Sequence, residues 1–366
     1  MPAVADGLRP QAGVPLAPFT TLGIGGEARW FLRASSADEV AAAHAWCCEH
    51  ECSLFVLGGG SNLVISDEGF KGLVVHIAIA GMTFGARGTQ TAVQVGAGEP
   101  WDNVVAVAVS RGLAGLECLS GIPGSAGGTP VQNVGAYGQE VADSITHVTV
   151  FDRQGAGVTT LSGDECRFGY RTSRFKREDA GRFVVCEVTF SLQAGPPTVT
   201  YPDVIHHVER AGISSPTLEA VREAVLAIRR RKGMVIDASD PDTRSVGSFF
   251  MNPVVPADLH ARIAAAFDGA VPGFPAKTGQ VKIPAAWLIE QSEFPRGSQS
   301  GHVGLSSKHP LAIVNRGGAT ARDVLSLAVR IKRRVADRFG VYLRPEPVFV
   351  GFADEADVLY LEKDIG

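Results

Sequence analysis

The sequence predicts an α+β protein with at least two regions. Strand and helix signals alternate from about Ala28 to Leu192, and the later strand-like runs alternate apolar and polar residues as antiparallel strands do. Two prolines and a glycine within 193–197 interrupt this pattern and predict a linker. A second region with strong helix signals follows. At 366 residues the chain is long enough for two or three domains of ordinary size.

The first region begins with a predicted strand at 30–32 and a helix from Ser36 to about His50. Ser36 and Glu39 have the spacing of a capping box. A helix over 101–111 is bracketed by Pro100, expected at the first helical position, and by Gly112 just past the end. Further strands are predicted at 54–57, 73–77, 92–95, 145–151, 158–161 and 183–192.

The second region contains two predicted helices. One starts at Ser215 and ends in the basic run 229–232 before Gly233, with Leu218, Val221, Val225 and Ile228 on its apolar face. The other starts with the capping box of Thr320 and Asp323 and stops at Gly340. Its inward residues are Val324, Leu327, Ile331, Val335 and Phe339. Lys332, Arg333 and Arg334 are interpreted as cations that a helix C-terminus favours.

Composition and charge exclude several classes of protein. The chain is 45% hydrophobic and 20% charged, which indicates a globular protein. A net charge of −4 gives no reason to expect nucleic acid or an acidic membrane as partner. Residues 1–6 lack the features of a signal peptide, and no apolar run could span a bilayer. We therefore expect a cytoplasmic protein.

Six cysteines do not predict a disulfide framework in a chain of this kind. Three of them share one predicted helical stretch with two histidines: Cys47, Cys48, Cys52, His44 and His50. A metal site is one interpretation. The apolar positions Val40, Ala43, Trp46 and Cys47 already describe a stripe that faces a core, and buried cysteine usually behaves as a small hydrophobe. We expect no metal.

The most unusual segment is 121–138, which has six glycines, two prolines and no charged residue. Glycine adopts positive φ and lets a ligand touch the main chain. Small hydrogen-bonding residues stand between: Ser125, Thr129, Gln132 and Asn133. This composition favours a backbone exposed to a large polar cofactor over a merely flexible loop.

A second glycine cluster, Gly58 to Asn62, directly follows the predicted strand 54–57. A strand followed by glycines and then Ser and Asn is how a diphosphate meets main-chain N–H groups. The segment contains neither the dinucleotide fingerprint G-x-G-x-x-G nor a Walker loop. Taken alone it is a weak signal.

Six motifs stand in order between about Phe19 and Gly351: TLGIGG at 21–26, LGGGSNL at 57–63, PVQNVGAYG at 130–138, GYRTSRFK at 169–176, GSFFMNP at 247–253 and RPEPVFVG at 344–351. Together they resemble the UDP-N-acetylenolpyruvoylglucosamine reductase family. One departure is Met251, where some relatives carry lysine.

The resemblance implies an FAD-binding fold of the vanillyl-alcohol-oxidase (PCMH) type in two subdomains, followed by an α+β substrate-binding domain. The implied limits are 18–193 for the FAD-binding domain, with an α/β half at about 18–80 and an antiparallel half at about 81–193, then 198–344 for the substrate domain. A C-terminal strand segment, 345–366, would bring Glu346 to the active site.

The implied reaction supplies a peptidoglycan precursor. NADPH would reduce non-covalently bound FAD, and flavin N5 would pass hydride to the enolpyruvyl ether of UDP-N-acetylglucosamine, in ping-pong order, to give UDP-N-acetylmuramate. The implied FAD contacts are Gly58, Gly59, Gly60, Ser61, Asn62, Ile122, Pro123, Gly124, Gly128, Thr129, Asn133, Gly135 and Tyr137. The implied substrate contacts are Tyr170, Tyr201, Lys232, Asn252 and Gln291.

Three residues are implied in catalysis. Hydride addition leaves negative charge next to the substrate carboxylate, and the fixed guanidinium of Arg171 suits that charge. Ser248 would donate the proton, with Glu346 nearby to make ionisation of the hydroxyl easier. The alternatives are a flavin oxidase of the same fold acting on a sugar or alcohol, and a flavin-binding protein without turnover. Neither glycine segment contains the histidine to which such oxidases often attach FAD.

Overall fold

The computed structural model describes residues 9–363, so the predicted lack of a signal peptide at 1–6 lies outside the described residues. Contacts divide the chain into two compact units. Unit 1 comprises Met1–Val14, Ala28–Gly60 and Lys71–Val235, and unit 2 comprises Pro15–Glu27, Ser61–Phe70 and Ile236–Gly366. The expected domain limits, 18–193 and 198–344, stay a prediction. Within the described part of the chain, no helix is long and apolar enough to cross a bilayer.

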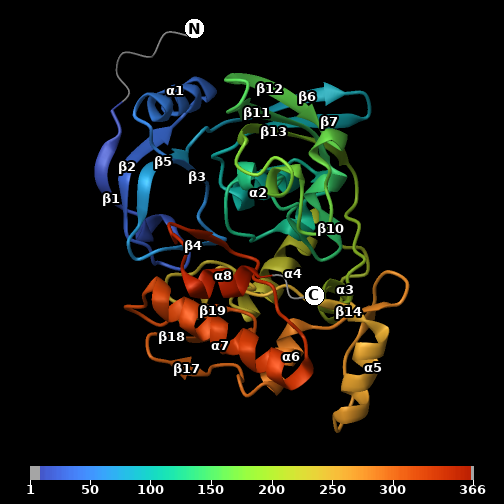
Figure 1. Cartoon of the computed structure of the whole chain (residues 1–366). Coiled ribbons are helices and arrows are strands. Elements are labelled where there is room, and N and C mark those ends of the chain that lie inside the picture. The colour runs from blue at the N-terminus through green and yellow to red at the C-terminus, as the bar shows by residue number, and fades with distance from the viewer. Residues whose placement is uncertain (1–8, 364–366) are drawn as a thin grey trace. The chain divides into compact units, whose positions relative to one another are not determined.

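Unit 1 contains two main sheets (Figure 1). One has the order β1-β2-β5-β3, with β3 parallel to β5. The other has the order β12-β11-β13-β7-β6 and is antiparallel throughout. The strands are β1 (Gln11–Pro15), β2 (Glu27–Ala34), β3 (Leu54–Leu57), β5 (Phe70–Ile77), β6 (Met82–Arg87), β7 (Gln90–Gly96), β8 (Leu113–Ala114), β9 (Gly135–Ala136), β10 (Gln139–Glu140), β11 (Ile145–Asp152), β12 (Gly157–Ser162) and β13 (Phe183–Ala194).

The predicted strands of the first region are therefore confirmed, while β1, β6 and the two-residue strands β8, β9 and β10 were not predicted. The expected linker starts late, because Gln193 and Ala194 still pair with β8. The helices of unit 1 are α1 (Ala37–Glu49), α2 (Trp101–Ser110), α3 (Pro202–Arg210) and α4 (Leu218–Arg231).

Helix starts in unit 1 differ in detail from the prediction. The Ser36 hydroxyl accepts the Glu39 N–H at 3.1 Å, and the Glu39 carboxylate accepts the N–H and hydroxyl of Ser35 at 2.5 and 2.8 Å. The carboxylate of the predicted capping box is therefore engaged by Ser35. Pro100 has ψ 126° and stands at the N-cap, one residue before the predicted position. Helix α4 begins after Thr217, whose hydroxyl caps it, and so starts later than the predicted Ser215.

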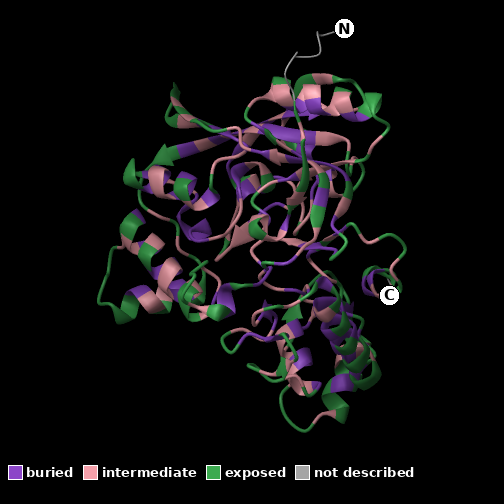
Figure 2. Cartoon of the chain, turned by 90° about the vertical axis from the view of Figure 1, so that its left-hand side faces the viewer, coloured by how far each residue is buried: buried purple, intermediate pink, exposed green. Residues whose placement is uncertain are grey.

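The core of unit 1 lies between its sheets and helices, where Figure 2 shows buried stretches in purple next to intermediate ones in pink. Trp101 of α2 packs against Phe190 of β13, with 5.7 Å between ring centroids, and its indole N–H donates to the Leu119 carbonyl at 3.1 Å. The predicted apolar face of α4 is buried; its residues Val221, Val225 and Ile228 share a core with Val204 and Val208 of α3, and Leu218 joins the main core of unit 1.

Unit 2 is built from short sheets and helices around its own core. Its elements are β4 (Leu63–Ile65), β14 (Val254–Pro256), α5 (Ala257–Ala266), β15 (Phe274–Pro275), β16 (Gln280–Lys282), α6 (Ala285–Gln291), β17 (Gln299–Ser300), β18 (Val303–Leu305), β19 (Ile313–Asn315), α7 (Ala321–Phe339), β20 (Val348–Val350) and α8 (Ala356–Glu362). Strand β20 pairs in parallel with β4. The expected C-terminal strand segment is β20 followed by a helix, α8.

Helix α7 forms as predicted. Thr320 and Asp323 make both bonds of the capping box, and Gly340 ends the helix with φ 65°. All five predicted inward residues are buried: Val324, Leu327, Ile331, Val335 and Phe339. The helix is also tied to β4 through the loop that follows this strand, because the Asp67 carboxylate accepts the N–H groups of Ala321 and Arg322 at 2.7 and 3.2 Å.

The sequence predicted that Lys332 interacts with the C-terminal end of its own helix. The structure shows a different role. Lys332 is fully buried, and its ammonium donates to the carbonyls of Tyr360, Leu361 and Lys363 at 2.9, 2.7 and 3.2 Å. These carbonyls lie at the C-terminal end of α8. A cation at a helix C-terminus is favoured, but the helix is a different one.

Replacing Lys332 by Met should lower the free energy of unfolding by about 2 kcal/mol or more, because the carbonyls at the end of α8 lose a charged donor. Arg333→Met is the matched control, since Arg333 is exposed and lies 5.0 Å from the Tyr360 ring; it should cost less than about 1 kcal/mol. Urea unfolding measures both. Equal losses would show that Lys332 does not hold α8.

Candidate functional site

The two glycine-rich segments predicted to bind a cofactor meet in unit 1. Residues Gly58–Gly60 follow β3 directly. A Cβ atom on Gly59 would lie 2.6 Å from the Gly124 Cα and 2.9 Å from the Ser125 nitrogen. A Cβ on Gly58 would lie 2.9 Å from the Ser125 hydroxyl. The segments therefore pack backbone against backbone, which only glycine permits.

The segment 121–138 is held in place along its length. The Gly124 carbonyl accepts the Trp101 N–H at 3.0 Å, and the Gly127 N–H donates to the Ala97 carbonyl at 2.9 Å. Gly127 packs so tightly that a Cβ would lie 2.6 Å from that of Ala97. Next to it, a Cβ on Gly128 would meet nothing within 4 Å. One side of the segment is thus fixed to the fold, and the other has open space.

An ion pair that the sequence did not suggest anchors the start of this segment. Asp102 of α2 accepts the Gly121 N–H at 2.6 Å and pairs with Arg222 of α4 at 2.6 and 2.8 Å. Burial opposes ionisation of Asp102, but these hydrogen bonds outweigh it and hold the pKa of the carboxyl below its usual value. The two partners are 120 residues apart, so no local pattern could reveal them.

Three predicted site residues adopt left-handed backbone conformations: Asn133, Tyr137 and Arg171, with φ of 48°, 49° and 53°. Asparagine tolerates this region, whereas tyrosine and arginine rarely enter it. The Asn133 amide is used to hold the loop, since it donates to Glu140 at 2.7 Å and accepts the Ala142 N–H at 3.1 Å. Strain of this kind is often found at functional sites.

Arg171 lies on a tight turn against the glycine-rich segment. Gly169 and Thr172 exchange two backbone hydrogen bonds of 3.0 and 3.1 Å, which leave Tyr170 and Arg171 at the tip. The Arg171 guanidinium donates to the Gly135 carbonyl and lies 5.3 Å from the ring of the exposed Tyr170. This contact fixes the guanidinium beside the predicted cofactor segment.

A second group in unit 1 combines aromatic rings with a cation. Tyr137 and Tyr201 meet edge to face, with 5.4 Å between centroids. The Lys232 ammonium lies 5.9 Å from the Tyr137 ring and 3.1 Å from the Asp203 carboxylate. Tyr137 was predicted to contact the cofactor, yet it adjoins two predicted substrate residues. Asp203 was missed, although it stands two positions after Tyr201.

Burial raises the pKa of Tyr137 in spite of the nearby cations Arg229 and Lys232. Its phenol therefore stays protonated at neutral pH and is available as a hydrogen-bond donor. Arg229, one of these two cations, also donates to the Met234 carbonyl at 2.8 Å.

Ser248 and Glu346 belong to unit 2, where their chain segments run side by side. The Glu346 N–H donates to the Phe249 carbonyl at 2.9 Å, and the Met251 N–H donates to the Arg344 carbonyl at 3.0 Å. Phe249 is completely buried, so this pairing is anchored in the core. Ser248, half-buried, follows Gly247, whose φ is 76°. The structure thus brings two of the three predicted catalytic residues onto neighbouring segments.

Ser61 and Asn62, also predicted to contact the cofactor, fall in unit 2. The Asn62 amide donates to the Glu346 carbonyl at 3.2 Å, and the Asn62 carbonyl accepts the Val348 N–H at 3.0 Å. Asn62 therefore holds the segment that carries Glu346. This contact joins residues 284 positions apart and was not predicted.

The predicted substrate residues Asn252 and Gln291 are not brought together. The Asn252 side chain accepts the Ala285 N–H at 2.9 Å at the start of α6, whereas Gln291 is the last residue of this helix. Seven helical residues span about 10 Å. The two residues therefore mark opposite ends of α6.

Comparison with known proteins shows the family to which the chain belongs. Residues 28–161 match the family model "FAD binding domain", and residues 240–350 match "UDP-N-acetylenolpyruvoylglucosamine reductase, C-terminal domain". The reductase of that name from Thermobifida fusca is 46% identical over 92% of this chain and 97% of the relative. The one from Mycobacterium leprae is 45% identical over 92% and 94%. The chain belongs to the UDP-N-acetylenolpyruvoylglucosamine reductase family.

A solved structure agrees with this assignment. UDP-N-acetylenolpyruvylglucosamine reductase from Thermus caldophilus is 28% identical, covers 94% of this chain and 99% of its own, and superposes with a TM-score of 0.63. The expected fold class is confirmed: a PCMH-type FAD-binding part and the C-terminal domain of this reductase family. The chain is a flavin-dependent oxidoreductase, so the expected cofactor FAD is confirmed.

The residues present fit FAD. Gly59 and Gly124 have no side chains, so their main-chain groups form the contact between the two segments. Gly128 leaves open space in the same segment as Gly124. Main-chain groups beside such open space bind diphosphate well. Gly58–Gly60 and the segment 121–138 would hold the cofactor.

Gly59→Ala should lower the ratio of bound flavin to protein and the melting temperature, because the new methyl group would push the two glycine segments apart. Gly85→Ala is the matched control, since a Cβ there meets nothing within 4 Å and Gly85 lies on β6. Flavin absorbance of the purified proteins and thermal unfolding measure the two effects. A Gly59→Ala protein with full flavin content would contradict the role given to this contact.

Proposed function

We propose that this chain catalyses the NADPH-dependent reduction of the enolpyruvyl ether of UDP-N-acetylglucosamine to UDP-N-acetylmuramate, with Arg171, Ser248 and Glu346 as catalytic residues. The match to reductases of that name over nearly their whole length supports the substrate. The observation that carries the mechanism is Arg171, a residue with φ 53° whose guanidinium is bonded to the glycine-rich segment.

Bound FAD supplies hydride transfer from NADPH to the enolpyruvyl double bond. Arg171 would stabilise the negative charge that this transfer creates next to the substrate carboxylate. A guanidinium can hold a carboxylate in the two-donor manner. The bond to the Gly135 carbonyl keeps the group oriented before the reaction.

Ser248 completes the reduction by giving its proton to the carbon that carries the new charge. A serine hydroxyl is a weak acid, so a neighbouring group must make its ionisation easier. A protonated Glu346 carboxyl would do this by donating to the serine oxygen, and the Glu346 backbone is fixed on both sides, by Phe249 and by Asn62. We propose that Glu346 orients the hydroxyl and later helps restore its proton.

Lys232 and Tyr201 would hold the UDP-sugar. An ammonium is a suitable point charge for diphosphate. Its partner Asp203 keeps it near Tyr137 and Tyr201 in the absence of substrate. The exposed Tyr170, together with Asn252 and Gln291, would add contacts along the substrate.

The product would feed peptidoglycan synthesis, with consequences for cell shape and division. NADPH and nucleotide-activated sugars are cytoplasmic metabolites, which places the proposed reaction in the cytoplasm. The alternatives of a flavin oxidase or a flavin-binding protein without turnover would need neither a proton donor nor a carboxylate-binding guanidinium for this substrate.

The proposed function predicts ping-pong kinetics, because NADPH and the enolpyruvyl substrate would use the same bound flavin in turn. Initial rates measured at several fixed NADPH concentrations should give parallel lines in a double-reciprocal plot. Intersecting lines would show that both substrates bind before either reacts. No turnover of the enolpyruvyl substrate would overturn the function itself.

Ser248→Ala should leave flavin reduction by NADPH nearly unchanged and slow flavin reoxidation by the enolpyruvyl substrate by at least roughly 10²-fold, the lower range for loss of a general acid. Ser248→Cys should recover part of the rate, since a thiol also donates. Arg171→Lys should slow the same step, because an ammonium lacks the two-donor geometry.

Stopped-flow absorbance of the flavin separates the two steps. Ser239→Ala, at an exposed serine of the same unit, is the control and should change neither. If Ser248→Ala slowed only the NADPH step, or neither step, Ser248 would be a structural residue.

A further inference from the structure

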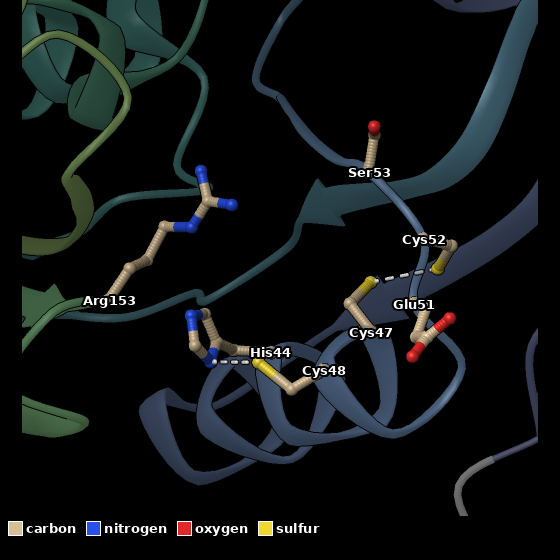
Figure 3. Close-up of a pocket in the computed structure, with 7 residues that line it drawn as sticks. All are labelled: His44, Cys47, Cys48, Glu51, Cys52, Ser53 and Arg153. Carbon is tan, nitrogen blue, oxygen red and sulfur yellow. Dashed lines mark hydrogen bonds between the residues drawn. The ribbon is translucent and has the colours of Figure 1, made fainter.

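A group of thiols at the end of α1 has no part in the proposed reaction. The side chains of His44, Cys47, Cys48, Cys52 and Arg153, with Glu51 and Ser53, line a pocket of about 370 Å³ in unit 1 (Figure 3). The Cys47 and Cys52 sulfurs are 3.4 Å apart, and the Cys48 sulfur lies 3.6 Å from His44 Nδ1. Within residues 9–363, no group of three or more His, Cys, Asp or Glu residues is placed to hold a metal ion.

The end of α1 explains why Cys47 and Cys52 meet. His50 is the C-cap, Glu51 follows in the left-handed conformation with φ 47°, and the Cys52 N–H donates to the Cys47 carbonyl at 3.0 Å. This is the Schellman motif, in which the side chains of these two positions pack together. In most proteins both are apolar, and here both are thiols.

The backbone at this motif also suits a disulfide. Bond lengths and the 3.0 Å hydrogen bond limit the distance between the Cα atoms of Cys47 and Cys52 to about 7 Å. Disulfides usually join Cα atoms about 4.4–6.8 Å apart. Because the sulfurs already touch, rotation of the two side chains is enough to bring them to bonding distance.

We propose that Cys47 and Cys52 form a reversible disulfide when the protein meets a hydroperoxide, so that the end of α1 is a site of oxidative modification. The Cys52 sulfur loses its proton and attacks the peroxide, whose O–O bond breaks to leave a sulfenic acid and an alcohol or water. The Cys47 sulfur then attacks the Cys52 sulfur. The S–O bond breaks, and the hydroxyl leaves as water with the Cys47 proton.

The order of attack follows from burial. Cys47 is buried, and burial together with the Cys52 thiol raises its pKa to about 12, so Cys47 has little thiolate with which to attack peroxide. Cys52 is half-buried and lines the pocket. The Arg153 guanidinium lines the same pocket and favours the thiolate form of Cys47 during the second attack.

The other four cysteines differ in how easily a peroxide can reach and oxidise them. Cys118, Cys166 and Cys186 are buried, and burial raises the pKa of each. Cys48 is exposed and faces His44, whose pKa burial and the Arg153 charge hold below its usual value. Cys48 is the rival site because it is exposed and lines the same pocket. The experiment must separate Cys47 from Cys48.

The test uses the reduced holoenzyme and a small molar excess of hydrogen peroxide, followed by alkylation under denaturing conditions. Two of the six thiols should be protected from alkylation, and dithiothreitol should restore all six. Glutamyl endopeptidase cleaves after Glu49 and Glu51, so mass spectrometry of the digest should show the Cys52 peptide linked to the peptide that contains Cys47 and Cys48.

Single variants identify the partner. Cys48→Ser should still lose two thiols and give the same linkage to Cys52, whereas Cys47→Ser and Cys52→Ser should form no internal disulfide. Turnover should be the same for the reduced wild type and Cys48→Ser. Loss of the linkage in Cys48→Ser would overturn the proposal, as would a wild-type protein whose only oxidation is on Cys48 or between two chains.

Discussion

The contact between Gly59 and Gly124 is the constraint on which the cofactor-binding part of unit 1 depends. It brings the end of β3 against the segment 121–138 with no side chain between them. Everything around it keeps that backbone in place: Asp102 holds Gly121, and Ala97 holds Gly127. A segment rich in glycine would otherwise be mobile, because glycine loses the most conformational freedom on folding.

The same segment also positions Arg171 and the turn that carries it. Gly135 accepts a hydrogen bond from Arg171, and Asn133 donates to the Gly169 carbonyl at 3.1 Å, next to the turn that carries Tyr170. Positive φ at Asn133, Tyr137 and Arg171 costs of the order of 1–3 kcal/mol each. These hydrogen bonds offset part of the strain. In unit 2 the segment that carries Glu346 is held by a backbone hydrogen bond to the buried Phe249.

Sequence signals were reliable where the partner is local. The capping box and 3.6-residue period of α7 gave its start, its buried face and its end at Gly340 correctly. They failed where the partner is distant. Lys332 stands in that same helix, yet its acceptors belong to α8, nearly thirty residues on. One local signal was also incomplete: at the start of α1, the neighbouring Ser35 engages the Glu39 carboxylate of the predicted capping box.

The candidate site shows the same division. Glycine composition predicted the cofactor segment 121–138, and Gly58 to Asn62 only weakly, but it could not show that the two touch, since packing of Gly59 on Gly124 is a tertiary contact. Ser248 has no local signal at all and was identified only through the family resemblance. Asp102 with Arg222, and Asn62 with Glu346, join residues more than a hundred positions apart and were missed.

The cysteines of α1 show how a correct structural inference can leave a function unnoticed. The sequence placed Cys47 in a core-facing stripe, and Val40, Ala43 and Cys47 are indeed buried. Burial seemed to argue against chemistry at this position. In the Schellman motif, however, the contact that buries the Cys47 side chain is also the contact with Cys52. The same contact therefore explains both the packing of Cys47 and its proposed disulfide with Cys52. Burial of Cys47 does not exclude the redox role.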